Sequence, residues 1–224
     1  MGIVELNEQA GIINIYSRLY FYGDAASQEI ASKVAADIQH CWNGPNATVI
    51  ISQRLFIVKF KIDGFHHTML TPEEVYANDD PANNYFRIEE NTHHDVSFVD
   101  GIGSNTGCFK LANLLQTATT AAHEYGHTIG LDHPRNIDIR GLGIPGIMYP
   151  RGTITDAEYL YNPIAIAGDS SNGGTMNPIH RQVTQADIAA LRLHKLAFDR
   201  SSRSILGEFT SIWHDNQKSY IGFC

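Results

Sequence analysis

Hydrophobic and polar positions follow two different periods along this chain, and these periods predict a mixture of strands and helices. From Leu55 to Ile62, apolar residues occupy alternate positions with Lys59 and Lys61 between them, which predicts a strand with one solvent-exposed face. Segments rich in Ile, Val, Tyr and Phe predict further strands over residues 12–22, 48–52, 85–89 and 96–99. Residues 63–84 and 101–107 show neither period, and we expect loops there.

Three segments carry the wider spacing of a helix. Apolar residues recur every three or four positions over residues 26–42, and Asn43-Gly44-Pro45 ends that helix. Residues 112–129 contain strong helix formers and are followed by a glycine, a natural terminator. Thr184 and Asp187 form a variant of the capping box and open a last helix, whose apolar positions extend to Leu196. Residues 132–178 are rich in Gly, Pro and Asn, and we expect them to be irregular.

The chain has 224 residues, of which 43% are hydrophobic, so it is long enough to bury one sizeable core. We therefore expect one α+β (α/β) domain over residues 1–224. It would have an upper lobe over about residues 10–131, a lower lobe over about residues 132–200, and a tail, residues 201–224, that packs back. We expect a monomer.

The distribution of charged and apolar residues argues against a nucleic-acid partner and against a membrane-spanning segment. The net charge is −8, and Lys and Arg form no basic run, so no nucleic-acid partner is expected. No stretch of eighteen apolar residues exists to span a membrane. Residues 1–11 lack the basic and then apolar segments of a secretory signal. The chain is therefore exported by another route, has lost its signal, or is a domain cut from a longer protein.

One motif carries specific chemistry. Residues 123–133 read HEYGHTIGLDH, so His123 and His127 are four residues apart and lie on one face of the predicted helix. Gly130 can adopt the positive φ that turns the chain sharply and returns His133 toward the same point. Three imidazoles leave a fourth position of a zinc ion open, which is typical of a catalytic site. Glu124, beside the first histidine, can take a proton from a metal-bound water.

This extended pattern, together with a methionine in residues 146–150 (GIMYP), resembles the metzincin clan of zinc metallopeptidases. Met-Tyr-Pro at this turn is similar to the matrixins, whereas Pro134 after His133 is similar to the serralysins. The resemblance implies a twisted mixed sheet with a backing helix and an active-site helix, above a small irregular lobe that ends in a helix. It also implies one catalytic zinc and hydrolysis of internal peptide bonds.

The resemblance assigns further roles to named residues. Met148 would form a hydrophobic floor under the metal ligands, and Tyr149 would shape the wall of the pocket for the substrate side chain after the cut. Pro150 stands where some clan members carry a tyrosine that approaches zinc, so no fifth ligand is expected. The substrate would be an extended protein or peptide segment bound antiparallel to an edge strand. Three candidates for that strand stay open: residues 85–89, 96–99 and 108–111.

Other polar residues have a metal-binding and an ordinary interpretation. His66-His67 and His93-His94 lack the ligand spacing of a second zinc site, so ordinary loop histidines are the default. Asp79-Asp80 and residues 169–174 offer oxygens to calcium, and turn chemistry explains both as well. His180 is a candidate for the rim of the pocket. Three cysteines (Cys41, Cys108 and Cys224) allow at most one internal disulfide.

Two alternatives to a general endopeptidase stay open. One is a toxin or effector peptidase with a single dedicated target and a proteinaceous inhibitor. The other is a module that binds zinc without catalysis. We expect a secreted or exported protein. We also expect residues 152–178, between the methionine turn and the last helix, to form a mobile wall that sets specificity.

Overall fold

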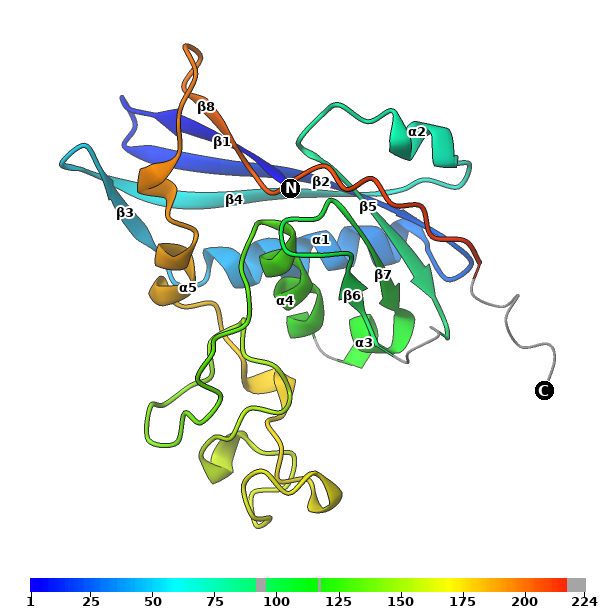
Figure 1. Cartoon of the computed structure of the whole chain (residues 1–224), viewed down its shortest axis with the longest axis vertical. Coiled ribbons are helices and arrows are strands. Elements are labelled where there is room, and N and C mark those ends of the chain that lie inside the picture. The colour runs from blue at the N-terminus through cyan, green and yellow to red at the C-terminus, as the bar shows by residue number, and fades with distance from the viewer. Residues whose placement is uncertain (92–95, 117, 217–224) are drawn as a thin grey trace.

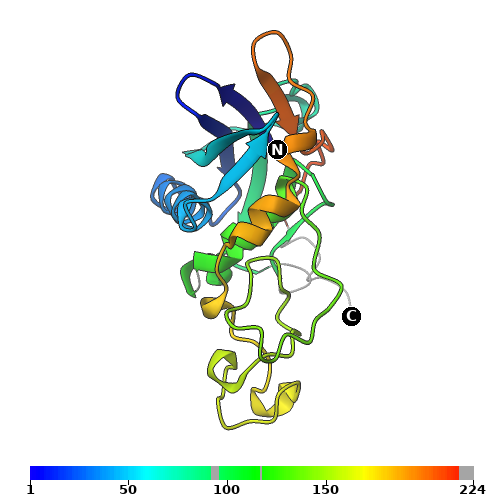
Figure 2. The same ribbon diagram turned by 90° about the vertical axis from the view of Figure 1, so that its left-hand side faces the viewer.

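A curled, mixed sheet forms the upper part of the molecule in the computed structural model, which describes residues 1–91, 96–116 and 118–216 (Figure 1). Six strands follow the order β3-β4-β2-β5-β7-β6, and β1 joins β2 to β8. The sheet curls into a half-barrel, as the side view shows (Figure 2). The strands are β1 (Gly2–Asn7), β2 (Ile12–Tyr22), β3 (Thr48–Ile51), β4 (Arg54–His66), β5 (Asn83–Glu89), β6 (Phe98–Val99), β7 (Thr106–Lys110) and β8 (Arg203–Leu206). The predicted α+β class is confirmed.

Strand β2 organises the sheet. It pairs parallel with β4 and β5, whereas β1 runs antiparallel to its first half. Strand β7 continues the parallel set beside β5, and β6 is antiparallel to β7 at the end of the order. Of the three candidate edge strands, β5 is therefore internal and β7 is covered by β6. Strand β6 forms one edge of the described sheet, and β3 ends the strand order on the other side.

The long helix α1 (Gln28–Asn43) backs the sheet, close to where the sequence predicts a helix. The Ser27 side chain accepts a hydrogen bond from the Ile30 backbone N–H and caps the first turn. The buried face of α1 joins the inward residues of β2 and β4 in one core, and Trp42 lies 5.1 Å from Phe60 between ring centroids. Full burial of each large apolar side chain stabilises the fold by about 1.5–3 kcal/mol.

Helix α4 (Ala118–Thr128) lies between this core and the lower part of the molecule (Figure 1), after the short helix α3 (Leu111–Gln116). The Trp42 indole N–H donates to the Ala122 carbonyl at 3.0 Å, and the hydroxyls of Ser17 and Tyr125 are 2.8 Å apart. Ala121 and Ala122 are buried. Their small side chains allow α4 to approach α1 closely, so both the sheet and α1 fix the position of α4.

Several elements differ from the predictions. Strands β1 and β8 were not predicted, because each segment is too short to show a clear hydrophobic period by itself. The two segments form strands by pairing with each other. The predicted loop over residues 63–84 is wrong in part: β4 continues to His66, and α2 (Pro72–Tyr76) forms on a Thr71–Glu74 capping box. Strand β7 also begins inside the segment predicted to be irregular.

The lower part of the molecule is irregular, as predicted. Between α4 and Thr184 the chain forms isolated bridges and short 3-10 turns. Helix α5 (Gln185–Ala190) begins at the predicted capping box of Thr184 and Asp187. It ends before Leu196, because Arg192 adopts a left-handed conformation with φ of 52° and a 3-10 turn follows.

The described part of the tail packs on the sheet, as predicted. Strand β8 pairs with β1, and the Trp213 ring stacks on Tyr22 with centroids 4.7 Å apart. The Asn105 side chain accepts hydrogen bonds from the backbone of Thr210 and Ser211. Residues 217–224, including Cys224, lie outside the described residues. Among the helices that the structure describes, none has the length and hydrophobicity needed to cross a membrane.

Candidate metal centre and its cleft

The middle of α4 presents two histidines on one face. His123 and His127 are one turn apart, with ring centroids separated by 4.8 Å, and they are 6% and 9% exposed. Glu124 follows His123 and is 8% exposed. Three chemically reactive groups therefore lie on a rigid helix that is held by the core rather than on a loop.

The turn after α4 brings in the third histidine. Gly130 adopts the predicted positive φ, at 98°, and the Leu131 N–H donates back to the Gly126 carbonyl at 2.9 Å. The chain then reverses, so that His133 Nε2 lies 3.0 Å from His123 Nε2 and 3.1 Å from His127 Nε2. His123, His127 and His133 form the only group of three or more metal-ligating side chains found close together in the described parts of the chain. We call these three residues the histidine cluster.

Backbone carbonyls orient the two helical imidazoles. His123 Nδ1 lies 2.7 Å from the Ile147 carbonyl, and His127 Nδ1 lies 2.7 Å from the Leu131 carbonyl. A carbonyl can only accept, so each Nδ1 carries the proton and donates it. Each Nε2 is then unprotonated and directs its lone pair at the other rings. Three Nε2 atoms that face one another in this way are arranged as ligands of a single ion.

The local environment keeps these rings neutral. Burial lowers the pKa of His123 to about 2, and burial also lowers the pKa of His127 and of His133. Neutral imidazole is the form that binds a metal. Burial acts on Glu124 in the opposite sense and raises its pKa to about 8, although the nearby Arg181 charge opposes the shift. A cation placed beside Glu124 would favour its carboxylate further.

A turn under the helix connects the cluster to the lower lobe. The Ile147 carbonyl accepts from His123, while its N–H donates to the Asp187 carboxylate, which also caps α5. Met148 is 2% exposed and packs against Gly126 of α4. The sequence indicated the capping role of Asp187. It gave no signal of the contact with Ile147, because residues 147 and 187 only become neighbours in the folded chain.

A cleft of about 280 Å³ opens beside the cluster. Its lining residues come from the segment before β6, from α3 and α4, from the turn after Met148, and from the segment before α5: Val96, Ser97, Asn113, Thr120, His123, Glu124, His133, Pro150, Arg151 and Arg181. The edge of the sheet therefore flanks the cleft. Residues 152–178 do not contribute to this lining, so their predicted role as a specificity wall stays a prediction.

The two residues after Tyr149 line this cleft, and the predicted role of Tyr149 in the substrate pocket stays a prediction. Pro150 and Arg151 line the cleft, whereas the Tyr149 side chain lines a neighbouring cavity with Met148. Tyr149 contributes its carbonyl, which accepts from Arg181. His180 packs against Tyr159, with ring centroids 5.7 Å apart, and the next residue, Arg181, reaches the cleft instead. The sequence did not predict Arg181 as a cleft residue, because a single arginine in an irregular segment belongs to no motif or period.

The other candidate metal ligands are explained by local contacts. Asp80 pairs with Arg18, and Asp169 accepts hydrogen bonds from Ser171 and Asn172, as turn chemistry predicts. His67 lies near Glu74, and His93-His94 lie outside the described residues. Cys41 and Cys108 are free thiols.

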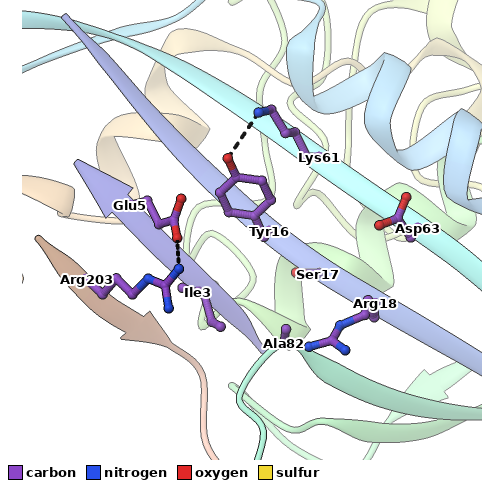
Figure 3. A pocket seen from close by; sticks show the side chains of 9 residues that line it. All are labelled: Ile3, Glu5, Tyr16, Ser17, Arg18, Lys61, Asp63, Ala82 and Arg203. Atoms are coloured by element: carbon purple, nitrogen blue, oxygen red, sulfur yellow. Dashed lines mark hydrogen bonds and ion pairs between the residues drawn. The ribbon is translucent and has the colours of Figure 1, made fainter. Parts of the chain in front are cut away.

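A second pocket lies on the face of the sheet opposite α1 (Figure 3). Lys61 donates to the Tyr16 hydroxyl at 3.0 Å, Arg203 pairs with Glu5, and Arg18 pairs with Asp80. This pocket has no convergent set of reactive groups. The cleft at the histidine cluster is therefore the better candidate for chemistry.

Comparisons with known proteins assign no relationship to this chain. No protein-family model matches it, and no curated protein matches its sequence. The function is therefore inferred from the residues of the site.

Proposed function

We propose that this chain is a zinc-dependent endopeptidase of the metzincin type. The observation that carries the proposal is the convergence of three imidazole Nε2 atoms beside Glu124, in a cleft flanked by the edge of a sheet. A site that binds a metal for structure alone is usually closed by four protein ligands. Here three ligands and a neighbouring buried carboxyl group fit a catalytic site better.

The donor set suits zinc. A tetrahedral ion with Zn–N distances of about 2.0–2.1 Å holds its nitrogens roughly 3.3 Å apart. The separations of 3.0 and 3.1 Å between Nε2 atoms in the structure are close to this value. The carbonyls of Ile147 and Leu131 supply the outer-shell acceptors that metal-binding histidines require. When bound, zinc supplies Lewis acidity that activates water near neutral pH and polarises the scissile carbonyl.

Glu124 is the proposed general base. Its carboxylate accepts a proton from the attacking water and afterwards gives it to the leaving amine. Burial raises the pKa of this group to about 8 before any effect of the metal. Glu124 lines the same cleft as His123 and His133.

Strand β6 is the proposed docking edge for the substrate. It pairs only with β7 in the described sheet, so its other side is free to accept an extended peptide. Main-chain hydrogen bonds to an edge strand do not depend on the side chains of the peptide, so peptides of many sequences can bind in the same register. The peptide bond nearest the histidine cluster would be the one that is cut.

The metzincin assignment depends on the pattern His123, Glu124, His127, Gly130 and His133, together with a methionine turn under the helix. The left-handed Gly130 and the packing of Met148 against α4 fit the roles that this resemblance implies. The sequence after His133 and after Met148 combines features of two subfamilies, so we propose the clan and no subfamily.

Hydrolysis of casein or of a fluorogenic peptide mixture tests the proposal. The zinc-loaded protein should cleave, and a chelator should stop cleavage until zinc is restored. Glu124→Ala should keep zinc and lose turnover by about 100-fold or more, the usual contribution of a general base. Glu158→Ala, an exposed glutamate outside the cleft, is the matched control. Cleavage that persists in Glu124→Ala would reject the proposed base.

A further inference from the structure

The cleft has a charge opposite to that of the whole protein. The chain carries a net charge of −8, yet two arginines, Arg151 and Arg181, line the cleft beside Glu124. Arg151 is exposed, whereas Arg181 is only 6% exposed. Arg181 is therefore the inner cation of the cleft.

Arg181 has no carboxylate close enough for an ion pair among the described residues. Glu124 interacts with Arg181 electrostatically, but the two side chains form no ion pair. Buried charges in proteins are normally paired, because an isolated one is costly. By contrast, the buried Arg87 of the sheet is paired directly with Glu89.

The guanidinium is also short of hydrogen-bond acceptors. It carries five N–H groups. Nη1 donates to the Tyr149 carbonyl at 3.1 Å, and Nη2 reaches the Thr119 hydroxyl at 3.4 Å, a long contact. Nε is buried and has no partner. Nη1 also lies 3.0 Å from His123 Nδ1, but that nitrogen gives its proton to the Ile147 carbonyl and offers no lone pair.

The position of Arg181 relates it to the reaction centre. Arg181 contacts Thr119 and His123 of α4, and it lines the cleft together with His123 and Glu124. A side chain that enters the cleft from a residue next to the scissile bond would therefore meet this cation. A carboxylate supplies both things that Arg181 lacks, a negative charge and acceptors in the planar arrangement that a guanidinium binds.

We propose that Arg181 makes this protein select substrates with Asp or Glu directly flanking the scissile bond. This inference rests on the proposed peptidase function and adds its substrate class. An acidic side chain neutralises the inner cation of the cleft, whereas a neutral side chain of the same shape leaves it unpaired. Arg181 is in this account a specificity-determining residue, and it takes no part in the transfer of protons.

Cleavage of a mixed peptide library by the zinc-loaded protein tests the selection. Cut sites identified by mass spectrometry should favour Glu over Gln, and Asp over Asn, by about tenfold or more at one flanking position, because charge-assisted hydrogen bonds are about twice as strong as neutral ones. Arg181→Gln should abolish this preference while retaining bound zinc. Arg151→Gln, at the exposed side of the same cleft, is the matched control and should keep most of it.

A binding measurement separates the inference from turnover. N-acetyl-glutamate amide and the corresponding N-acetyl-glutamine amide are titrated into the zinc-loaded protein. Binding is followed by NMR through the arginine Nε–H signals. Tighter binding of the glutamate probe to wild type, lost in Arg181→Gln, supports a carboxylate-binding site at Arg181. This result holds even if the protein cuts no peptide, and absence of cleavage would reject only the proposed peptidase function. Equal cleavage or binding of the acidic and amide forms overturns the inference and leaves the peptidase proposal intact.

A second substitution at residue 181 serves as a control in case Arg181→Gln does not fold. Arg181→Lys keeps the charge and loses the planar fork, so it should retain part of the acidic preference. If Arg181→Gln fails to fold, comparison of wild type with Arg181→Lys decides the question. A reduced or lost acidic preference in a folded, zinc-binding Arg181→Lys supports recognition by the guanidinium, and a preference equal to that of wild type overturns it.

Discussion

Gly126 has no side chain, and the sulfur of Met148 occupies the space into which one would project: an added Cβ would lie 2.2 Å from Met148 Sδ. Gly126 is the residue before His127, and Met148 follows Ile147, whose carbonyl orients His123. This contact therefore sets how closely the turn approaches the histidine cluster. It connects the packing of the core with the geometry of the candidate metal centre.

Replacement of Gly126 by alanine should destabilise the protein. The added Cβ also lies 3.2 Å from the Trp42 ring, so two buried side chains would have to shift, and overpacking of this kind costs about 1–3 kcal/mol. Urea unfolding of the metal-free protein measures the change. Gly152→Ala is the control, because no atom lies within 4 Å of the added Cβ there.

A double-mutant cycle assigns the cost to the contact with Met148. Met148→Ala alone leaves a cavity and should destabilise by about 2–5 kcal/mol. In the Gly126→Ala/Met148→Ala protein the new methyl group fills part of that cavity, so the two changes should cost less together than their sum. Strict additivity would show that residues 126 and 148 do not share this space.

Loss of His133 should weaken metal binding while sparing the fold. His133 is exposed, whereas His123 and His127 are buried in α4. His133→Ala should reduce zinc affinity by more than the roughly 10- to 100-fold that loss of an outer-shell partner costs. Competition with a chromogenic chelator measures it, and His180→Ala provides a histidine outside the cluster as the control. Equal affinities of the two variants would remove His133 from the site.

Asp187 should influence the metal site from a distance. Its carboxylate caps α5 and accepts the Ile147 N–H, so it holds the peptide that orients His123. Asp187→Ala should lower stability by about 0.5–2 kcal/mol through loss of the cap. It should also lower zinc affinity, by less than His133→Ala does. A variant with reduced stability and unchanged zinc affinity would show that the cap acts on the helix alone.

Glu124 should make the metal-free protein less stable as the pH rises. Burial raises the pKa of this carboxyl group from 4.5 to about 8, so between these pH values the unfolded chain releases a proton that the folded chain retains. Stability relative to Glu124→Gln should then fall by about 1.4 kcal/mol per pH unit across this window and level off on either side. The comparison cancels the histidines, which are the same in both proteins.

Chemical unfolding of both proteins at several pH values in the presence of a chelator measures this difference. A constant difference from pH 5 to pH 8 would mean that the Glu124 carboxyl group is ionised in the folded protein at all of them. With zinc bound the slope should become smaller, because a nearby cation favours the carboxylate.

The sequence was most informative where the chemistry is local. The spacing of His123, His127 and His133, and the need for a left-handed residue at Gly130, are properties of one helix and one turn, and the structure brings the three rings together. The amphipathic helix α1 and the alternating strand β4 were predictable for the same reason, since each has a clear period over eight residues or more.

The rest depended on contacts between distant segments. Strands β1 and β8 stabilise each other across about 200 positions of sequence, so neither is visible alone. The choice of β6 as the edge follows from the pairing order and not from its two residues. Arg181 and Asp187 reach the site through an irregular segment and a short helix, and no period or spacing relates them to His123.

X-ray absorption at the zinc edge, on the protein loaded with one equivalent of zinc, tests the account most directly. The account predicts three imidazole nitrogens at about 2.0–2.1 Å and one further light atom from solvent, and it predicts that His133→Ala reduces the imidazole count to two. A shell with only two imidazoles in the wild type, or with a fourth protein side chain in the open position, would contradict it.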